Sequence, residues 1–464
     1  MNKFDTIVKS TLVYSVGNLG SKILSFLLVP LYSFFLTKSD LGYYDILLTT
    51  LTLLVPLVSV QISEATYRWL MDVKLSHDEH YRRVISTSFY ILVMGLITWT
   101  IALHFAFIFI SFKYQTLFVL LVLVTTTLQY LQQVARGLKK TRSYSASGLL
   151  YTLLLLLFNG VLLYSCDDKL FGVLIATILA NLICVLYLGF SSGIGNYFRL
   201  SCWSSVDARM MVAYSWPLIP NAVSWWMISL ANKYLIIWFI GVDANGIFAI
   251  SNRFPAIILI INTVFMLALQ DFILLDTSKQ KDYSKFFNTF LRIELSLTLV
   301  LISMSRLMTL GLISHSFYES WRYMPVLFLS VGVSAVASFL GNGYIETKQT
   351  KNIFYTTLVG GVINIGFTLL LIKYIGLYAA SFGTLLGFLV ITLIRYRQMN
   401  FYFKIHPEYK IMSLFLISTF TCSTLLFLER LFIDLLLIIG SILLAIAVNR
   451  KIVLLALNKI LKNR

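Results

Sequence analysis

Uninterrupted apolar runs of about 20 residues recur along the chain, and about 20 apolar residues are what a helix needs to cross a bilayer core. The runs lack the strict alternation of apolar and polar residues that marks a membrane β-strand. The pattern therefore predicts an all-α polytopic membrane protein with about 14 transmembrane helices. The expected spans are 10–36, 42–66, 84–110, 115–135, 145–165, 170–190, 211–240, 246–270, 286–309, 323–345, 353–373, 377–396, 411–429 and 432–449.

The spans fall into two related halves. The segment Leu41-Gly-Tyr-Tyr-Asp-Ile46 aligns with Asn245-Gly-Ile-Phe-Ala-Ile250, and in both places a glycine-aromatic turn joins two long spans. Further pairs of matching positions are Asn159 with Asn364 and Gly172 with Gly376. Membrane transporters are often built from such repeats, with the substrate site between them. We expect two pseudo-symmetric six-helix halves around a central cavity. The expected parts are 1–200, 201–400 and a pair of extra helices with a basic cytoplasmic tail in 401–464.

The composition supports a membrane protein without a soluble domain. Hydrophobic residues make up 58% and charged residues 12%, whereas typical soluble domains carry about 25% charged residues. There is no GxxxxGK[ST] phosphate-binding loop. The four cysteines lie singly without metal-binding spacing. No metal and no cofactor is expected.

The basic residues predict the orientation. If the N-terminus is cytoplasmic, most of the 37 lysines and arginines fall in cytoplasmic segments. Such an excess in short loops marks the cytoplasmic side. Both termini are therefore expected in the cytoplasm. The same bias accounts for most of the net charge of +17 without nucleic acid as a partner.

Three cations lie well inside predicted spans: Lys22, Lys233 and Arg253. A cation at the centre of a span costs roughly 2.5–3.5 kcal/mol on insertion scales, so it normally faces a watery interior and has a function. Prolines, which bend helices, punctuate the same spans and the second span. They are Pro30, Pro56, Pro217, Pro220 and Pro255. The pattern predicts a cationic cavity suited to a phosphate or pyrophosphate group.

Three more charged residues are candidates for substrate binding, and each has an alternative role. Arg292 lies close enough to the cytoplasmic surface to extend toward it. Arg68, near Glu64, is equally consistent with a membrane anchor or a cytoplasmic vestibule. Asp45 begins the second span, where an acidic residue also serves as an interface anchor.

The sequence resembles the multidrug/oligosaccharidyl-lipid/polysaccharide (MOP) exporter superfamily. It is more closely similar to the polysaccharide biosynthesis proteins, the Wzx-type flippases. Ser21-Lys-Ile-Leu-Ser-Phe26 is similar to the first-helix motif of the related lipid II flippases, and Gly246-Ile-Phe-Ala-Ile-Ser-Asn-Arg253 is similar to their eighth-helix segment. The resemblance implies that Lys22 and Arg253 match cavity arginines. Asn252 replaces an acidic residue and Leu28 an arginine, and both departures argue against lipid II as the cargo.

The resemblance implies a flippase and not an enzyme. Its cargo would be an undecaprenyl-pyrophosphate-linked oligosaccharide, an O-antigen or capsule repeat unit, carried across the bacterial cytoplasmic (inner) membrane by alternating access. The expected partners are this glycan, membrane lipids, a coupling ion (H+ or Na+) and a polysaccharide polymerase.

Two other functions are alternatives to a flippase. A multidrug antiporter of the same superfamily would need acidic cavity residues for cationic drugs, whereas the predicted cavity is cationic. A membrane polymerase or glycosyltransferase characteristically has a large outer loop with catalytic residues, and the predicted outer loops are short.

The charge bias predicts the side on which each loop lies. We expect reporter fusions to read cytoplasmic after Thr141, Arg209, Lys351 and Lys410, and external after Lys113, Asp168 and Asp243. Paired phosphatase and fluorescent-protein fusions measure this directly. An external signal from the 136–142 loop would contradict the two-half repeat.

Overall fold

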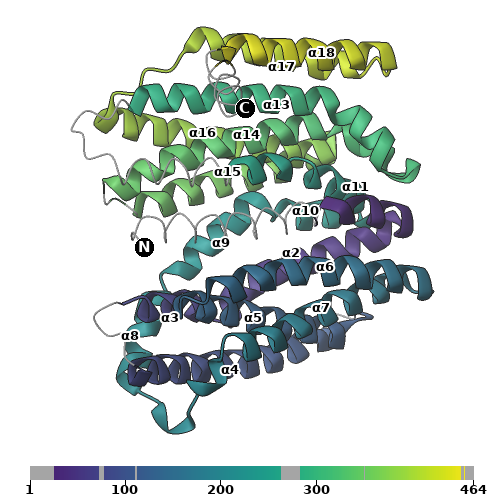
Figure 1. Cartoon of the computed structure of the whole chain (residues 1–464). Coiled ribbons are helices and arrows are strands. Elements are labelled where there is room, and N and C mark those ends of the chain that lie inside the picture. The colour runs from purple at the N-terminus through teal and green to yellow at the C-terminus, as the bar shows by residue number, and fades with distance from the viewer. Residues whose placement is uncertain are drawn as a thin grey trace, which may run out of the picture. The chain divides into compact units, whose positions relative to one another are not determined.

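The computed structural model describes residues 24, 26–72, 78–109, 112–262, 283–347, 349, 351–450 and 454. Over these residues the chain forms helices joined by short turns (Figure 1). Among them, 12 helices are long and apolar enough to cross a membrane. The chain divides into two compact units, residues 1–226 and 227–464, and each is described by itself.

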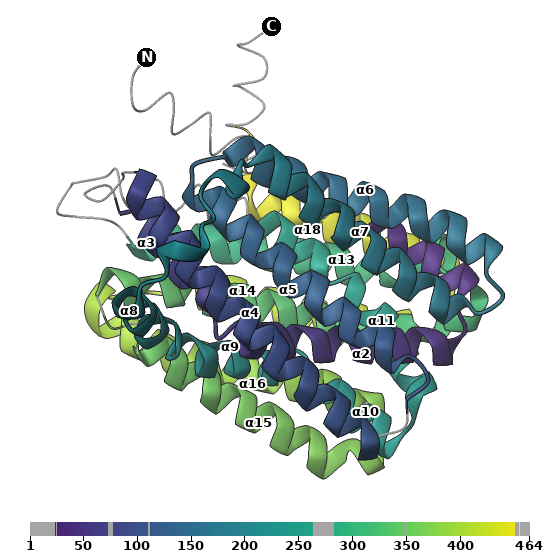
Figure 2. The ribbon, with the colours of Figure 1, turned by 90° about the horizontal axis from the view of Figure 1, so that it is seen from below.

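The first unit is a bundle in which α5 packs against α2, α3, α6 and α7 (Figure 2). Its elements are α2 (Lys38–Val58), α3 (Ile62–Leu70), α4 (Asp78–Phe109), α5 (Gln115–Gly137), α6 (Thr141–Ser165), α7 (Lys169–Ser191), η2 (Ile194–Asn196), η3 (Leu200–Cys202), α8 (Ser205–Ser215) and the start of α9 (Leu218–Ser229). The contact boundary lies in α9, beyond residue 200, because α8 packs against α3 and α4. The division at residues 200 and 400 concerns the sequence repeat and stays a prediction.

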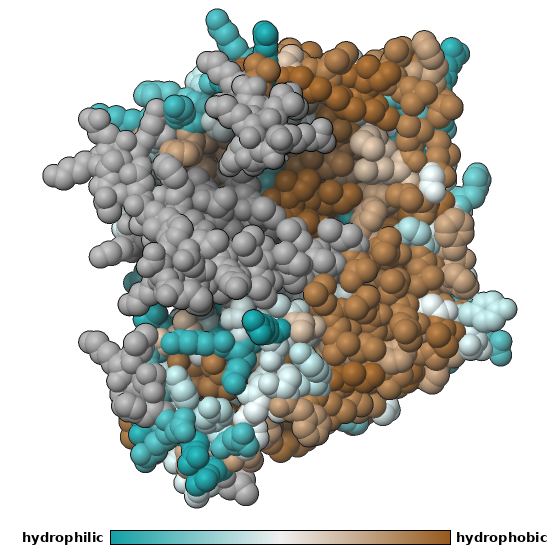
Figure 3. Space-filling model, viewed as in Figure 1, coloured by the Kyte–Doolittle hydropathy of each residue, from teal (hydrophilic) through white to brown (hydrophobic). Residues whose placement is uncertain are grey.

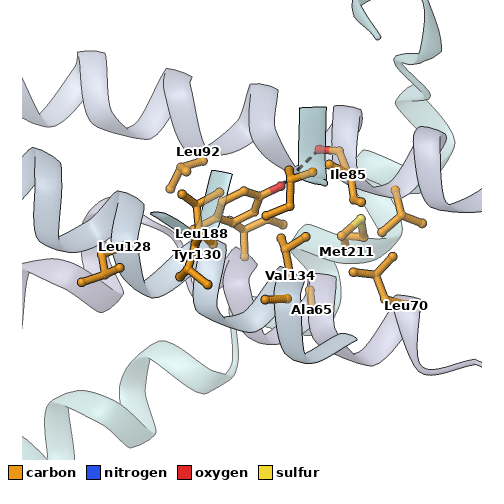
Figure 4. Packing of buried hydrophobic residues seen from close by; sticks show 14 of the residues in the cluster. Ala65, Leu70, Ile85, Leu92, Leu128, Tyr130, Val134, Leu188 and Met211 are labelled. Carbon is orange, nitrogen blue, oxygen red and sulfur yellow. Dashed lines mark hydrogen bonds between the residues drawn. The ribbon is translucent and has the colours of Figure 1, made fainter. Parts of the chain in front are cut away.

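A buried cluster holds α3, α4, α5, α7 and α8 together (Figure 4). Tyr130 of α5 is fully buried at its centre. Its hydroxyl donates to the carbonyl of Ile85 at 3.2 Å and lies 2.8 Å from the Ser88 hydroxyl. The phenol is therefore satisfied inside an otherwise apolar core, as a buried polar group must be. Apolar side chains around it include Leu92, Leu128, Val134, Leu188 and Met211.

In the second unit, α16 packs against both α14 and α15, and α13 packs against α14, α17 and α18. The elements are α10 (Asn232–Phe239), α11 (Val242–Arg253), α13 (Tyr283–Leu312), η4 (His315–Arg322), α14 (Met324–Glu346), α15 (Lys351–Ile375), α16 (Leu377–Phe403), α17 (Tyr409–Leu426) and α18 (Leu431–Val448). Helical backbone also resumes over 256–262, after α11.

Some helices expose their apolar side chains and bury their polar ones. On α18, the buried residues are Asp434 and Ser441, and Figure 3 shows apolar residues covering this side of the second unit. On the second half of α4, large apolar residues repeat every three or four positions and are more than half exposed. They are Met94, Ile97, Ile101, Phe105 and Ile108. In water this arrangement would be unfavourable, whereas in a bilayer these side chains contact lipid.

Three expected spans are not continuous helices, and the one predicted at 246–270 is interrupted at Phe254-Pro255. The span predicted at 211–240 is divided into α8, α9 and α10, because the chain turns at Trp216-Pro217 and again at Leu230-Ala231. Pro217 has no N–H to continue α8. The span predicted at 42–66 ends at Val58, and the left-handed residues Val60 (φ 49°) and Gln61 (φ 53°) separate α2 from α3.

The first expected span, 10–36, lies mostly outside the described residues. Its described part contains the short apolar helix Phe26–Phe35. The 12 apolar helices correspond to the other expected spans, apart from the divided 211–240 segment.

Three polar contacts attach α18 to α13 within this apolar surrounding. They join Asn449 to Ser296 at 2.8 Å, Ser441 to Ser303 at 2.9 Å, and Asp434 to Arg306. Inside a membrane, helices gain no hydrophobic stabilisation from each other over lipid, so packing and interhelical hydrogen bonds hold them together. This polar ladder is therefore a specific attachment of α18 to α13.

The Arg306 guanidinium is the most fully bonded part of the polar ladder. It pairs with Asp434, and its Nε donates to the Tyr318 hydroxyl at 2.9 Å. A third bond runs to the backbone carbonyl of Glu429 at 2.7 Å. The side chains of Arg306 and Asp434 are only 9% and 0% exposed. Removing one partner leaves the other charge buried and uncompensated.

We expect Asp434→Ala to destabilise the protein by roughly 3–5 kcal/mol, the usual cost of breaking a buried ion pair. The double variant Arg306→Met/Asp434→Leu should recover much of that loss because it removes both charges. Thermal unfolding of the purified protein in detergent measures both. Lys113→Ala, which breaks the exposed pair with Asp168, is the control and should change Tm little. A double variant less stable than Asp434→Ala would contradict this assignment.

Candidate functional site

Lys233 and Arg253 lie on one helical hairpin of the second unit. Lys233 is in the first turn of α10 and only 8% exposed, and Arg253 is the half-buried last residue of α11. The two helices pack together across Gly241, whose φ of 126° suits only glycine. At 1.5 Å per residue, the cations lie about 12 Å and 18 Å from this turn. Both cations therefore lie toward the open end of the hairpin, opposite its turn.

A helix break adjoins each of these cations. The helix is interrupted at Leu230-Ala231, just before Lys233, where the Lys233 N–H bonds the Leu230 carbonyl at 3.2 Å. It is interrupted again at Phe254-Pro255, just after Arg253. Breaks in membrane helices occur where the backbone is buried in protein or lines a watery cavity, and many transporters bind charged ligands at such breaks. The structure therefore places each of the two cations beside an interruption of the helix.

An asparagine network fixes the start of α10 against α15 and α16. The amide nitrogen of Asn232 lies 2.9 Å from Asn364 Oδ1, 3.0 Å from the Ala380 carbonyl and 3.1 Å from the Thr384 hydroxyl. Asn364 in turn donates to the carbonyl of Ile228 at 2.9 Å, on the other side of the break. Both asparagines are buried. The network ties the two ends of the broken helix to one neighbouring asparagine.

Arg292 is held by a carboxylate. Its guanidinium forms two bonds to Glu408, just ahead of α17, one of them from Nε at 2.6 Å. Asn288, one turn earlier on α13, binds the Glu408 N–H at 3.1 Å and the His406 carbonyl at 2.8 Å. Arg292 thus fastens the segment before α17 to α13.

Asp45 and Arg68 belong to the first unit and lie on different helices. Asp45 is buried on α2, next to Tyr44, whose hydroxyl lies 3.2 Å from that of Thr177. Arg68 is exposed in the last turn of α3. Its neighbour Glu64 accepts a hydrogen bond from Gln133 at 2.8 Å. Lys22 lies outside the described residues, so its role stays a prediction.

Arg395 is a buried cation that the sequence pattern does not identify as intramembrane, because it lies near the end of a predicted span. Arg395 of α16 is 1% exposed, and four neutral oxygens surround its guanidinium. They belong to the Ala337 carbonyl (2.8 Å), the Thr356 and Thr357 hydroxyls (both 3.0 Å) and the Ile353 carbonyl (3.4 Å). These bonds cross-link α14, α15 and α16, so Arg395 is part of the framework.

Among the described residues, no three or more His, Cys, Asp or Glu side chains gather where they could hold a metal ion.

The sequence matches the family profile "Polysaccharide biosynthesis protein" over residues 7–270. The chain belongs to this family. The matched region includes the whole hairpin with Lys233 and Arg253. No curated protein matches the sequence.

Solved structures of MOP-superfamily transporters share the fold of this family member. A lipid II flippase, MurJ, in an inward closed conformation, is 14% identical with a TM-score of 0.68, covering 95% of this chain and 100% of its own. An inward-facing multidrug-resistance MATE transporter is 12% identical with a TM-score of 0.62, covering 84% and 94%. A MOP transporter from Pyrococcus furiosus, described as having a binding pocket of reversed polarity, is 13% identical with a TM-score of 0.55, covering 85% and 96%. The expected all-α membrane fold of the MOP superfamily is therefore confirmed.

The Arg292–Glu408 contact makes a prediction about stability. We expect Arg292→Ala and Glu408→Ala each to lower the free energy of unfolding by about 1 kcal/mol, the upper end for a partly exposed ion pair. The double variant should lose little more than either single variant, because both remove the same contact. Thermal unfolding of the four proteins in detergent gives the coupling. Fully additive losses would show that the two side chains act independently.

Proposed function

We propose that this protein is a flippase that carries an undecaprenyl-pyrophosphate-linked oligosaccharide across the cytoplasmic membrane by alternating access. The O-antigen or capsule repeat unit is the expected cargo. The observation that carries the proposal is the pair Lys233 and Arg253, placed at helix breaks within an apolar membrane unit of a polysaccharide biosynthesis protein. Anionic groups suited to such a pair are phosphates, and a pyrophosphate is the anionic part of a lipid-linked sugar.

The two cations have different chemistry toward a pyrophosphate. Arg253 offers a planar fork of donors that binds two phosphate oxygens at once, whereas Lys233 offers a compact charge with rotatable donors. Lys22 would add a third cation from the first half. Asp45 and Arg68 of the first unit stay candidates for substrate binding. Arg292 is the weakest of the six candidates because Glu408 already engages its guanidinium.

The lipid tail would stay in the surrounding membrane while the head group and sugars cross. A coupling ion or removal of the product by a polymerase would give the cycle its direction. Both the lipid II flippase and the MATE transporters have this fold, so the fold alone does not select the cargo. The cationic character of the hairpin favours an anionic head group over a cationic drug.

We expect Arg253→Ala to abolish most surface polysaccharide while the protein reaches the membrane at a normal level. A hydrogen bond to a charged group contributes roughly 1.5–3 kcal/mol, which is about ten- to hundred-fold in affinity. Arg253→Lys should be partly active because it keeps the charge but loses the two-point contact. The measurement is surface polysaccharide in a strain lacking its own flippase, complemented with each variant, alongside immunoblots of membranes.

Arg397→Ala removes an exposed arginine of α16 and is the matched control, with wild-type export expected. Full export by Arg253→Ala would remove this residue from the site. Wild-type complementation of drug efflux without complementation of polysaccharide export would support the antiporter instead.

A further inference from the structure

Glu294 is a buried carboxyl group that neither the helix bundle nor the proposed substrate site uses. It lies on the membrane helix α13 and is 1% exposed. At 1.5 Å per residue, it is about 16 Å from the start of α13 at Tyr283 and about 27 Å from its end at Leu312. Among the described residues, neither of its carboxyl oxygens forms a hydrogen bond of standard geometry. Almost every other polar group buried along this helix is bonded, so Glu294 is exceptional.

Other polar groups without partners surround this carboxyl. Thr298 lies one turn further along the same face of α13, and its hydroxyl oxygen is also buried and unbonded within the described structure. Both side chains face Gly332 of α14, where an added Cβ would lie 2.6 Å from Thr298 Oγ1 and 3.6 Å from Glu294 Oε1. The side-chain amide of Asn262 interacts with the Glu294 carboxyl, although no hydrogen bond of standard geometry joins the two described groups. Together these four residues form a small polar site within the second unit.

No described cation faces the site. The charged and titratable groups on α13 and on the elements packed against it are engaged elsewhere or exposed. Arg292 binds Glu408, Arg306 binds Asp434 and Arg322 binds Glu429, while Lys285, His315, Glu319 and Lys410 are exposed. Tyr318 binds Arg306, Tyr323 contacts Tyr378, Tyr344 binds Gln398, Tyr409 contacts Tyr396, and Cys422 lies near Asp434.

An ionised carboxylate cannot persist in such surroundings. Burying a charge without a counterion or hydrogen bonds is so unfavourable that the group takes up a proton instead. A protonated carboxyl has one O–H donor and can bond with a hydroxyl or an amide, which are the groups beside it. The buried form of Glu294 is therefore the neutral acid. If a change of conformation admits water, the carboxyl can release this proton.

We propose that Glu294, with Thr298 and Asn262, is a proton-exchange site of the second unit that couples transport to the proton gradient. Glu294 binds one proton as the site closes to water and releases the same proton when the site opens. Because Gly332 has no side chain, the Thr298 hydroxyl and the Glu294 carboxyl can lie beside its backbone. The coupling role rests on the proposed flippase function, whereas the exchange of a proton at Glu294 does not. Acidic residues inside membrane proteins commonly serve in proton relays.

Infrared spectroscopy of the purified full-length protein tests proton binding without any substrate. The carbonyl stretch of a protonated carboxylic acid should be present at neutral pH in the wild type and lose one component in Glu294→Gln. Glu319→Gln removes an exposed carboxyl group of η4 and should keep the wild-type signal. Identical spectra for the wild type and Glu294→Gln at neutral pH would overturn the proposal. A carboxylate band that responds to added Na+, and is missing from Glu294→Gln, would assign a sodium site and overturn it as well.

Polysaccharide export tests the coupling. Glu294→Gln, which mimics the permanently protonated acid, should reach the membrane normally but lose most export. Its remaining export should not respond to a protonophore. Glu294→Asp should restore protonophore-sensitive export. If Glu294→Gln exports normally with wild-type sensitivity, the coupling role is wrong. If the wild type itself exports no polysaccharide, the proposed function fails, and the infrared result alone decides whether Glu294 exchanges a proton.

Discussion

The bilayer interior offers no water to polar groups, and every polar atom in a membrane helix must therefore find its partner within the protein. This constraint explains the inward polar face of α18 and the polar ladder that joins it to α13. It also explains Arg395, a buried cation surrounded by carbonyl and hydroxyl oxygens of two neighbouring helices. In this chain the apolar residues favour insertion into the membrane, and the polar residues form specific contacts between neighbouring helices.

The same constraint distinguishes the charged residues that hold the helices together from those that are candidates for function. Arg306 and Arg395 are surrounded by bonds to neighbouring helices, so their charges are used in holding the bundle together. Lys233 and Arg253 adjoin interruptions of the helix, and the Glu294 carboxyl forms no hydrogen bond of standard geometry among the described residues. A buried carboxyl such as that of Glu294 is stable only if something else completes its surroundings, such as water or a proton. This distinction is why the proposals rest on these three residues.

Much of this architecture could be predicted from the sequence because lipid exposure leaves long apolar runs. The break at Pro217 has a local cause in the sequence, and Pro56 precedes the break at Val60-Gln61, whereas no proline or glycine lies at Leu230-Ala231. Arg292 illustrates a different limit. Its partner Glu408 is 116 positions away, so no local pattern distinguishes a cation held in the framework from one that awaits a ligand. The sequence shows Asn364 as an asparagine in an apolar run. It does not show that Asn364 bonds to residues on both sides of a helix break.

The Arg306–Asp434 pair also bears on how the chain is assembled. Arg306 is synthesised more than a hundred residues before Asp434, so α13 enters the membrane before the carboxylate that will neutralise it exists. Until then the guanidinium has only closer groups such as the Tyr318 hydroxyl available. A chain made only as far as residue 430 leaves this cation without its counter-charge, a defect that a membrane quality-control protease could recognise. The last helix is therefore needed before the charge of Arg306 is neutralised.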